Sequence, residues 1–146
     1  MTRIDFYILG SRHPQAAWQT ACRLAEKAYR LQHAIYIHTP DADHSEQLDK
    51  LLWTFRDGSF VPHCLHAEPH ADHSPVLIGH DPRPEEELRH HQLLINLDHE
   101  VPPFFSRFER VAEIVGAEEQ QRRQGRERFR FYRERGYELQ THELAG

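Results

Sequence analysis

The sequence has few cysteines and no long hydrophobic run, and both shortages limit where the protein can work. Cys22 and Cys64 are its only cysteines among 146 residues, one in a helical pattern and one in an expected loop. A disulfide framework is therefore not expected, and a reducing cytoplasm fits. No stretch approaches the roughly 20 apolar residues that span a bilayer, and the first residues do not resemble a secretory signal. We predict a cytoplasmic protein without a membrane segment.

Glycine is scarce where a nucleotide-binding protein would need it. The seven glycines never cluster, and the segment LGSRHPQ after the first apolar run holds one glycine and no lysine. Loops that bind phosphate need several glycines so that backbone N–H groups can approach the anion. The net charge of −5 also argues against a protein that coats nucleic acid. We therefore predict no nucleotide site and no cofactor.

Short apolar runs alternate with helical patterns along the chain. Continuous apolar strands separated by helices are typical of a parallel sheet with helices on both faces. We predict one Rossmann-like three-layer α/β/α domain over residues 1–146, with a mostly parallel sheet and no nucleotide-binding loop. The expected strands are 4–9, 34–38, 75–79, 92–97 and 108–116, with a short closing strand at 137–140; the expected helices are one after Pro14, one capped by Asp41 or Asp43, and one over 118–135.

Cysteine and histidine gather after the second expected helix and raise the question of a metal site. Cys64, His66, His70 and His73 could supply four zinc ligands, but structural zinc sites usually carry two tight ligand pairs separated by a spacer. The chain has 13 histidines in all, so such a cluster also arises by chance, and a solvated polar loop is favoured. A thiol nucleophile at Cys64 would need a helix N-terminus or a fixed basic neighbour, which the sequence does not indicate. No metal site and no catalytic residue are predicted.

Aromatic residues flank a turn signal just before this cluster. Trp53 ends a helical pattern, and Phe60, Val61 and Pro62 follow Asp57-Gly58, a typical turn pair. These side chains could close over the domain's own core. They could equally form an exposed apolar patch, and such patches mark protein interfaces.

Arginine is concentrated near the end of an otherwise acidic chain. Residues 122–135, RRQGRERFRFYRER, contain seven of its 18 Lys and Arg residues. Arg122, Arg126, Phe129, Arg130 and Arg133 share one face of the expected helix. A solvated face balanced by glutamates is one interpretation. A basic groove with an aromatic floor is the other, and there arginine could bind a carboxylate or phosphate through paired hydrogen bonds.

These segments together resemble one known family. DFYIL near the start, LLWTFRDGSFVPHCL in the middle and RERFRFYRERGYEL near the end are similar in order and spacing to the chi subunit of bacterial DNA polymerase III. The resemblance covers essentially the whole chain. It implies a Rossmann-like adaptor that is not an enzyme and that binds no cofactor.

The resemblance also implies partners and the residues that contact them. In the family, the psi subunit connects chi to the clamp-loader complex, and chi also binds the C-terminal tail of the single-stranded-DNA-binding protein, so contact with DNA is indirect. The positions matching the psi contact are Trp53, Phe60, Val61 and Pro62. The positions matching the tail site are Val115, Arg122, Arg126, Phe129 and Arg130. The family pattern has Tyr and Lys where this chain has Phe129 and Arg130, so a hydroxyl is missing here.

Two other functions stay open at the level of sequence. One is a small cytosolic α/β enzyme whose site carries no recognisable motif. The other is a protein that binds single-stranded DNA directly through the arginine-rich helix, although few aromatic residues on that face could stack on bases.

Overall fold

A single sheet organises the fold in the computed structural model, which describes residues 1–66, 74–81 and 90–145. The strand order is β3-β4-β2-β5-β6-β1-β7, and every strand pair is parallel. The seven strands in these residues are β1 (Arg3–Leu9), β2 (Ile35–His38), β3 (His63–Leu65), β4 (Val76–Gly79), β5 (Leu93–Asn96), β6 (Arg110–Val115) and β7 (Glu138–Leu144).

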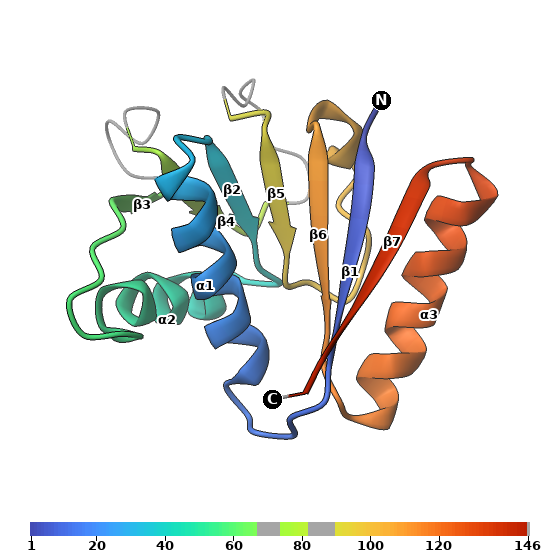
Figure 1. Ribbon diagram of the computed structural model, residues 1–146, viewed down its shortest axis with the longest axis horizontal. Coiled ribbons are helices and arrows are strands. Elements are labelled where there is room, and N and C mark those ends of the chain that lie inside the picture. Colours follow the sequence, from blue (N-terminus) through green and yellow to red (C-terminus); the bar gives the residue numbers. More distant parts are fainter. Residues whose placement is uncertain (67–73, 82–89, 146) are drawn as a thin grey trace.

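Helices cover both faces of the sheet and give the fold three layers (Figure 1). Alternate side chains of a strand point to opposite faces, so Ile35 and Ile37 join one core while Tyr36 joins the other. Two helices pack on the first core, and the third helix packs with a 3₁₀ turn on the second. These elements are α1 (Ala16–Arg30), α2 (Ala42–Thr54), α3 (Glu119–Glu134) and the turn Phe105–Arg107. The predicted three-layer α/β fold is confirmed.

Two of the helices begin at residues that satisfy their free backbone N–H groups. The Asp41 carboxylate accepts a hydrogen bond from the backbone N–H of His44 at 2.8 Å and caps α2, one of the two caps that the sequence offered. Glu118 and Gln121 form a reciprocal capping box at the start of α3. Gly136, with φ 79°, follows the end of α3 in the left-handed conformation that glycine adopts without strain.

The structure differs from the expected elements at both edges of the sheet. His63–Leu65 forms strand β3, so Cys64 lies in a strand and not in the loop that the sequence predicted. Three residues are too few for apolar periodicity to reveal a strand. At the other edge, the closing strand runs over seven residues, Glu138–Leu144, rather than four. It pairs with β1 along its full length, because each residue from Arg3 to Leu9 has a partner in β7.

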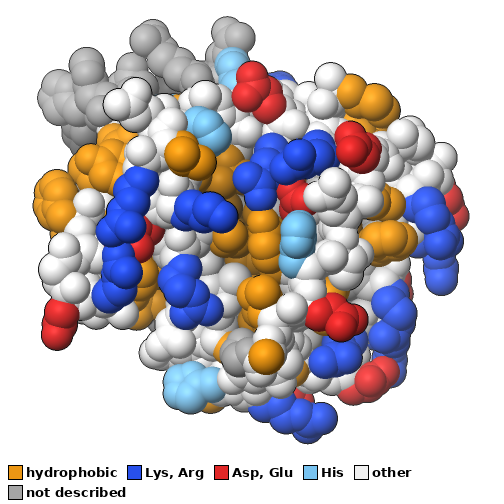
Figure 2. All heavy atoms as spheres, in the orientation of Figure 1, with side chains coloured by type: hydrophobic (Ala, Val, Ile, Leu, Met, Phe, Trp, Pro, Cys, Tyr) orange, Lys and Arg blue, Asp and Glu red, His pale blue; other side chains and the backbone are white. Residues whose placement is uncertain are grey.

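The α1 side of the sheet carries a polar cluster near β7. Figure 1 shows α1 lying over the middle of the sheet, and Figure 2 shows basic side chains and histidine around hydrophobic ones on this face. The buried carboxylate of Asp5 accepts a hydrogen bond from Arg110 Nε at 2.7 Å and lies 3.1 Å from His142 Nε2. The His142 ring stacks on Tyr7 at 4.8 Å between centroids. This cluster ties together β1, β6 and β7.

A second polar cluster lies within the core on the α3 side. Glu113, which is fully buried in β6, accepts hydrogen bonds from three side chains on two other elements, α3 and β5. Arg128 Nε donates at 2.9 Å, the Tyr132 hydroxyl at 2.6 Å, and Asn96 Nδ2 at 2.9 and 3.0 Å to the two carboxylate oxygens. These bonds fix the orientation of α3 on the sheet, which positions the pocket described next.

Candidate functional site

A pocket of about 220 Å³ opens between α3 and the sheet. Strands β1, β6 and β7 supply its floor and one wall, and α3 supplies the other wall. For comparison, an engineered protein cavity of about 150 Å³ takes up benzene, so this pocket has room for one aromatic ring. Its lining residues are Phe6, Ile8, Val115, Arg122, Gly125, Arg126, Phe129 and Thr141.

The apolar part of the pocket depends on close packing between α3 and β6. Val115, at the end of β6, is 3% exposed and lies against Gly125. A Cβ atom at residue 125 would lie only 2.7 Å from Val115 Cγ1, so a larger residue could not let the helix approach this closely. The Phe129 ring, half-buried, packs edge-to-face on Phe6 with centroids 5.3 Å apart. Glycine and the two rings thus define the depth of the pocket.

Two arginines from successive turns of α3 line this pocket. Arg122 is held in place because it donates hydrogen bonds to the carbonyl oxygens of Ala117 at 3.2 Å and Leu9 at 3.4 Å. The Arg126 side chain is 62% exposed. Within the described part of the chain it forms one ion pair, with Glu119 at 3.4 Å. A surface ion pair of this kind contributes at most about 1 kcal/mol. Arg126 is therefore ready to exchange Glu119 for a carboxylate brought by a ligand.

The family resemblance predicted five residues for the tail site, and four of them line this pocket. They are Val115, Arg122, Arg126 and Phe129, and Arg130 is exposed on α3 but is not one of the lining residues. Sequence reasoning missed Phe6, Ile8 and Thr141. Phe6 and Ile8 share a face because they alternate along β1, a signal that was available. Thr141 could not have been found, since its place depends on β7 pairing beside β1.

A second surface feature is formed where α2 ends and β3 begins. Trp53 is 49% exposed and Phe60 is 66% exposed, and their ring centroids lie 5.7 Å apart. We call Trp53, Phe60 and the half-buried Pro62 the aromatic patch. The structure therefore favours exposed side chains over lids on the core. Val61 differs from the expectation: its side chain is fully buried in the core, so it supports the patch from below.

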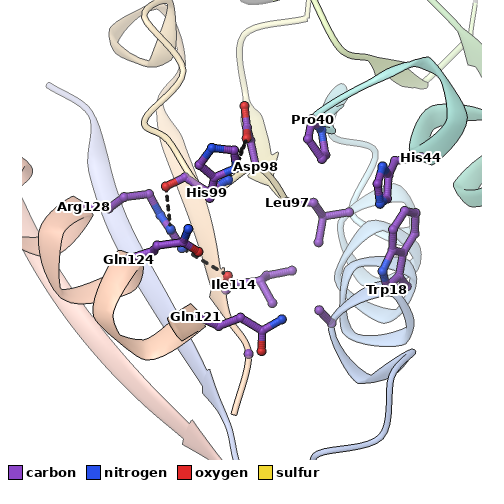
Figure 3. Close-up of a pocket in the computed structure, with 12 residues that line it drawn as sticks. Trp18, Pro40, His44, Leu97, Asp98, His99, Ile114, Gln121, Gln124 and Arg128 are labelled. Carbon is purple, nitrogen blue, oxygen red and sulfur yellow. Dashed lines mark hydrogen bonds and ion pairs between the residues drawn. The ribbon is translucent and has the colours of Figure 1, made fainter. Parts of the chain in front are cut away.

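A third feature lies at the carboxyl ends of β2, β5 and β6, where Rossmann-like folds usually bind their ligands. Figure 3 shows this pocket of about 200 Å³, with Trp18 and His44 stacked 5.1 Å apart on one side and α3 on the other. Its charged groups already have partners within the protein. Arg128 donates to the carbonyl oxygens of His99 and Ile114. Burial acts to raise the pKa of Asp98, but hydrogen bonds from His38 and His99 outweigh it, so the pKa lies below its usual value.

The cysteine and histidine cluster falls partly outside the described residues, because His70 and His73 lie there. Within residues 1–66, 74–81 and 90–145, no three metal-binding side chains come together. The ring of His66 packs against Tyr36, with centroids 5.6 Å apart. Burial raises the pKa of the Cys22 thiol to about 12, so this thiol is poorly suited to nucleophilic chemistry. No helix in the described part of the chain is both long and apolar enough to cross a bilayer.

The fold and the surface features define a Rossmann-like α/β domain that carries an arginine-lined pocket and an aromatic patch. A family model described as DNA polymerase III chi subunit, HolC, matches residues 1–140. The chain belongs to this family, whose members are accessory subunits of the replicative polymerase.

Curated relatives agree with the family model. The chain is 48% identical over 144 residues to the DNA polymerase III subunit chi of Pseudomonas aeruginosa, covering 99% of this chain and 98% of that one. It is 29% identical to the Haemophilus influenzae subunit, covering 97% and 96% of the two chains. The Escherichia coli subunit is also 29% identical, with 97% of each chain covered.

Among solved structures, the crystal structure of T4 UvsW is similar in fold. Its TM-score is 0.65 at 8% sequence identity, and the match covers 97% of this chain but 42% of that one. At this identity the likeness concerns the fold alone.

Proposed function

We propose that this chain is a cytoplasmic, non-catalytic adaptor of the DNA polymerase III holoenzyme. It binds the psi subunit, which connects it to the clamp loader, and it binds the C-terminal tail of the single-stranded-DNA-binding protein. The chain therefore links the clamp loader to DNA that is already coated by that protein, and its own contact with DNA is indirect. Membership of the chi family supports this role.

The observation that carries the proposal is the pocket between α3 and the sheet. The tails expected for this family are acidic and end in phenylalanine with a free carboxylate. An apolar pocket with room for one ring, bordered by Arg122 and Arg126, is complementary to such an end. The ring would lie against Phe6 and Phe129, and an arginine would bind the terminal carboxylate through charge-assisted hydrogen bonds. Arg130, one turn beyond Arg126, would attract the acidic residues that precede the ring.

The aromatic patch supports the second half of the proposal. Trp53 and Phe60 expose apolar rings beside each other on the surface, and large rings of this kind dominate binding energy in protein interfaces. Pro62 completes the patch, and buried Val61 fixes the loop beneath it. The patch lies on α2 and the loop before β3, whereas the pocket lies between α3 and strands β1, β6 and β7, so both partners can bind at once.

Three titrations of the purified full chain test this function. We expect binding to purified psi, binding to an acidic peptide that ends in phenylalanine, and little binding to a single-stranded oligonucleotide. Psi and the peptide should bind without competing. Failure to bind either protein ligand would overturn the proposal, and tight, salt-sensitive binding of the oligonucleotide alone would favour a direct DNA-binding role for α3.

A further inference from the structure

His63 connects the aromatic patch to the body of the domain. It is the first residue of β3 and its side chain is fully closed to solvent. Its Nδ1 atom lies 2.6 Å from the carbonyl oxygen of Val61, in the loop that carries Phe60 and Pro62. Its Nε2 atom lies 2.8 Å from the carbonyl oxygen of Asp49, in the middle of α2. One ring therefore bridges the two elements that present the patch.

The partners of this ring determine how many protons it carries. A backbone carbonyl oxygen only accepts hydrogen bonds, so each ring nitrogen must carry a hydrogen to bond to its partner. A neutral imidazole carries one such hydrogen, and only the imidazolium carries both. The Asp49 carboxylate lies 3.3 Å from Nε2 and is the charged group that the described residues place on this ring.

The same ring lies under Trp53. The two ring centroids are 4.2 Å apart and the ring planes are inclined at 46°. A cation close to the face of an indole ring is attracted by its quadrupole, so an imidazolium at this place would hold the tryptophan in position. Phe60 in turn lies against Trp53.

We propose that His63, donating from both ring nitrogens, is the residue that positions Trp53 and Phe60 for binding the partner. This inference rests on the proposed function for the identity of the partner, psi, and it deepens that function by making binding depend on one ring that is itself closed to solvent. Replacement of that ring leaves both carbonyl oxygens without their donor and removes the ring that packs against Trp53. Affinity for psi should therefore decrease when His63 is replaced.

The first test measures binding of psi to the full chain by calorimetry. We expect His63→Gln to weaken binding about tenfold, the size of effect that one hydrogen bond produces. His44→Gln, which changes an exposed histidine that stacks on Trp18 instead, should retain the wild-type affinity. Equal affinities of the wild-type chain and His63→Gln would overturn the proposal.

The second test needs no partner and separates this inference from the proposed function. Long-range proton–nitrogen spectra of histidine-labelled free chain report how many hydrogens each imidazole carries. We expect both His63 nitrogens to carry a hydrogen, and the Trp53 indole signal to shift in His63→Gln. If psi fails to bind but these signals behave as expected, the proposed partner is wrong and the positioning role stands. A neutral His63 ring with an unchanging Trp53 signal overturns the positioning role whatever psi does.

Discussion

The side chains of Glu113 and Arg128 form an ion pair that is almost completely closed to solvent. Arg128 Nε lies 2.9 Å from Glu113 Oε1, and the two side chains are 5% and 0% exposed. The pair joins β6 to α3 and so holds the helix that carries the arginine-lined pocket. A buried ion pair adds little over a well-packed apolar pair, but removal of one partner leaves a buried charge uncompensated.

We therefore expect Glu113→Ala to reduce the free energy of unfolding by about 3–5 kcal/mol. Arg128 would be left in the core without its carboxylate, and Tyr132 and Asn96 would lose an acceptor. Urea unfolding followed by circular dichroism measures the change. The matched control is Glu119→Ala, which breaks the exposed pair with Arg126 and should cost at most about 1 kcal/mol. Equal costs for the two variants would contradict this account.

Gly125 should tolerate alanine poorly although alanine favours helices. In an exposed helix, replacing glycine by alanine would raise the free energy of unfolding by about 1 kcal/mol. Here the new Cβ would lie 2.7 and 2.8 Å from the two methyl groups of buried Val115, and overpacking of this kind costs about 1–3 kcal/mol. We expect a lower melting temperature together with weaker binding of the phenylalanine-terminated peptide. Adding Val115→Ala should restore the melting temperature in part, and a more stable Gly125→Ala variant would show that the contact is not tight.

Asp5 should make the protein sensitive to acid. Burial acts to raise its pKa, but hydrogen bonds from His142 and Arg110 outweigh burial, so the pKa lies below its usual value. A carboxyl group whose folded-state pKa is lowered stabilises the folded state above its unfolded pKa, and this stability is lost as the pH falls through the folded pKa. Wild-type stability should fall from about pH 5 downward, and Asp5→Asn should show a shallower fall. The midpoint of urea unfolding, measured across this pH range for both chains, tests this expectation. Parallel pH curves for the wild-type chain and Asp5→Asn would contradict the role given to Asp5.

Trp53 and Phe60 should matter for binding and little for folding. Because both side chains are exposed, Trp53→Ala and Phe60→Ala should leave the circular dichroism spectrum unchanged. Each should weaken psi binding by about 2 kcal/mol or more, the size expected of an aromatic anchor. Leu31→Ala is a suitable control, since Leu31 is a 62% exposed apolar residue elsewhere on the surface. Unfolding of either aromatic variant would assign the rings to the core instead.

Arg126 should bind the carboxylate of the tail. Arg126→Ala should weaken binding of the acidic, phenylalanine-terminated peptide by about 1.5–3 kcal/mol, the cost of losing a charge-assisted hydrogen bond. Amidation of the peptide terminus should cost a similar amount, and the two changes together should cost less than their sum if the groups touch. Arg123→Ala on the same helix, outside the pocket lining, is the control. Equal affinity for the free and the amidated peptide would exclude the carboxylate contact.

Local pattern was sufficient to predict most of the sheet and all three helices. The run Ile4–Leu9 and the alanine spacing of α1 carry their periodicity within a few residues, and Asp41 caps α2 through a local hydrogen bond. Strand β3 could not be predicted in the same way. It is three residues long, and it is a strand because His63–Leu65 pairs with Val76–Ile78. That pairing is a tertiary contact without a local signature.

The residues of the candidate sites were likewise predictable only where their signal is local. Arg122, Arg126 and Phe129 share a helical face, so spacing alone groups them. The buried positions of Val61 and His63 depend on how the loop after α2 meets the core, which no periodicity encodes. The family resemblance supplied Val61 as a contact residue, and the structure places that side chain beneath the surface.

The place of β1 in the sheet has a consequence for how the protein is made. Strand β1 pairs only with β6 and β7 among the described strands, residues 110–115 and 138–144. The apolar segment IDFYIL therefore leaves the ribosome well before either of its neighbours in the sheet has been synthesised. Proteins with such distant pairings fold slowly, and their unpaired strands are prone to aggregate meanwhile. Release of β7 from the ribosome thus gives β1 its second neighbour, and a nascent chain stalled before Glu138 would expose one edge of β1 to solvent and to other chains.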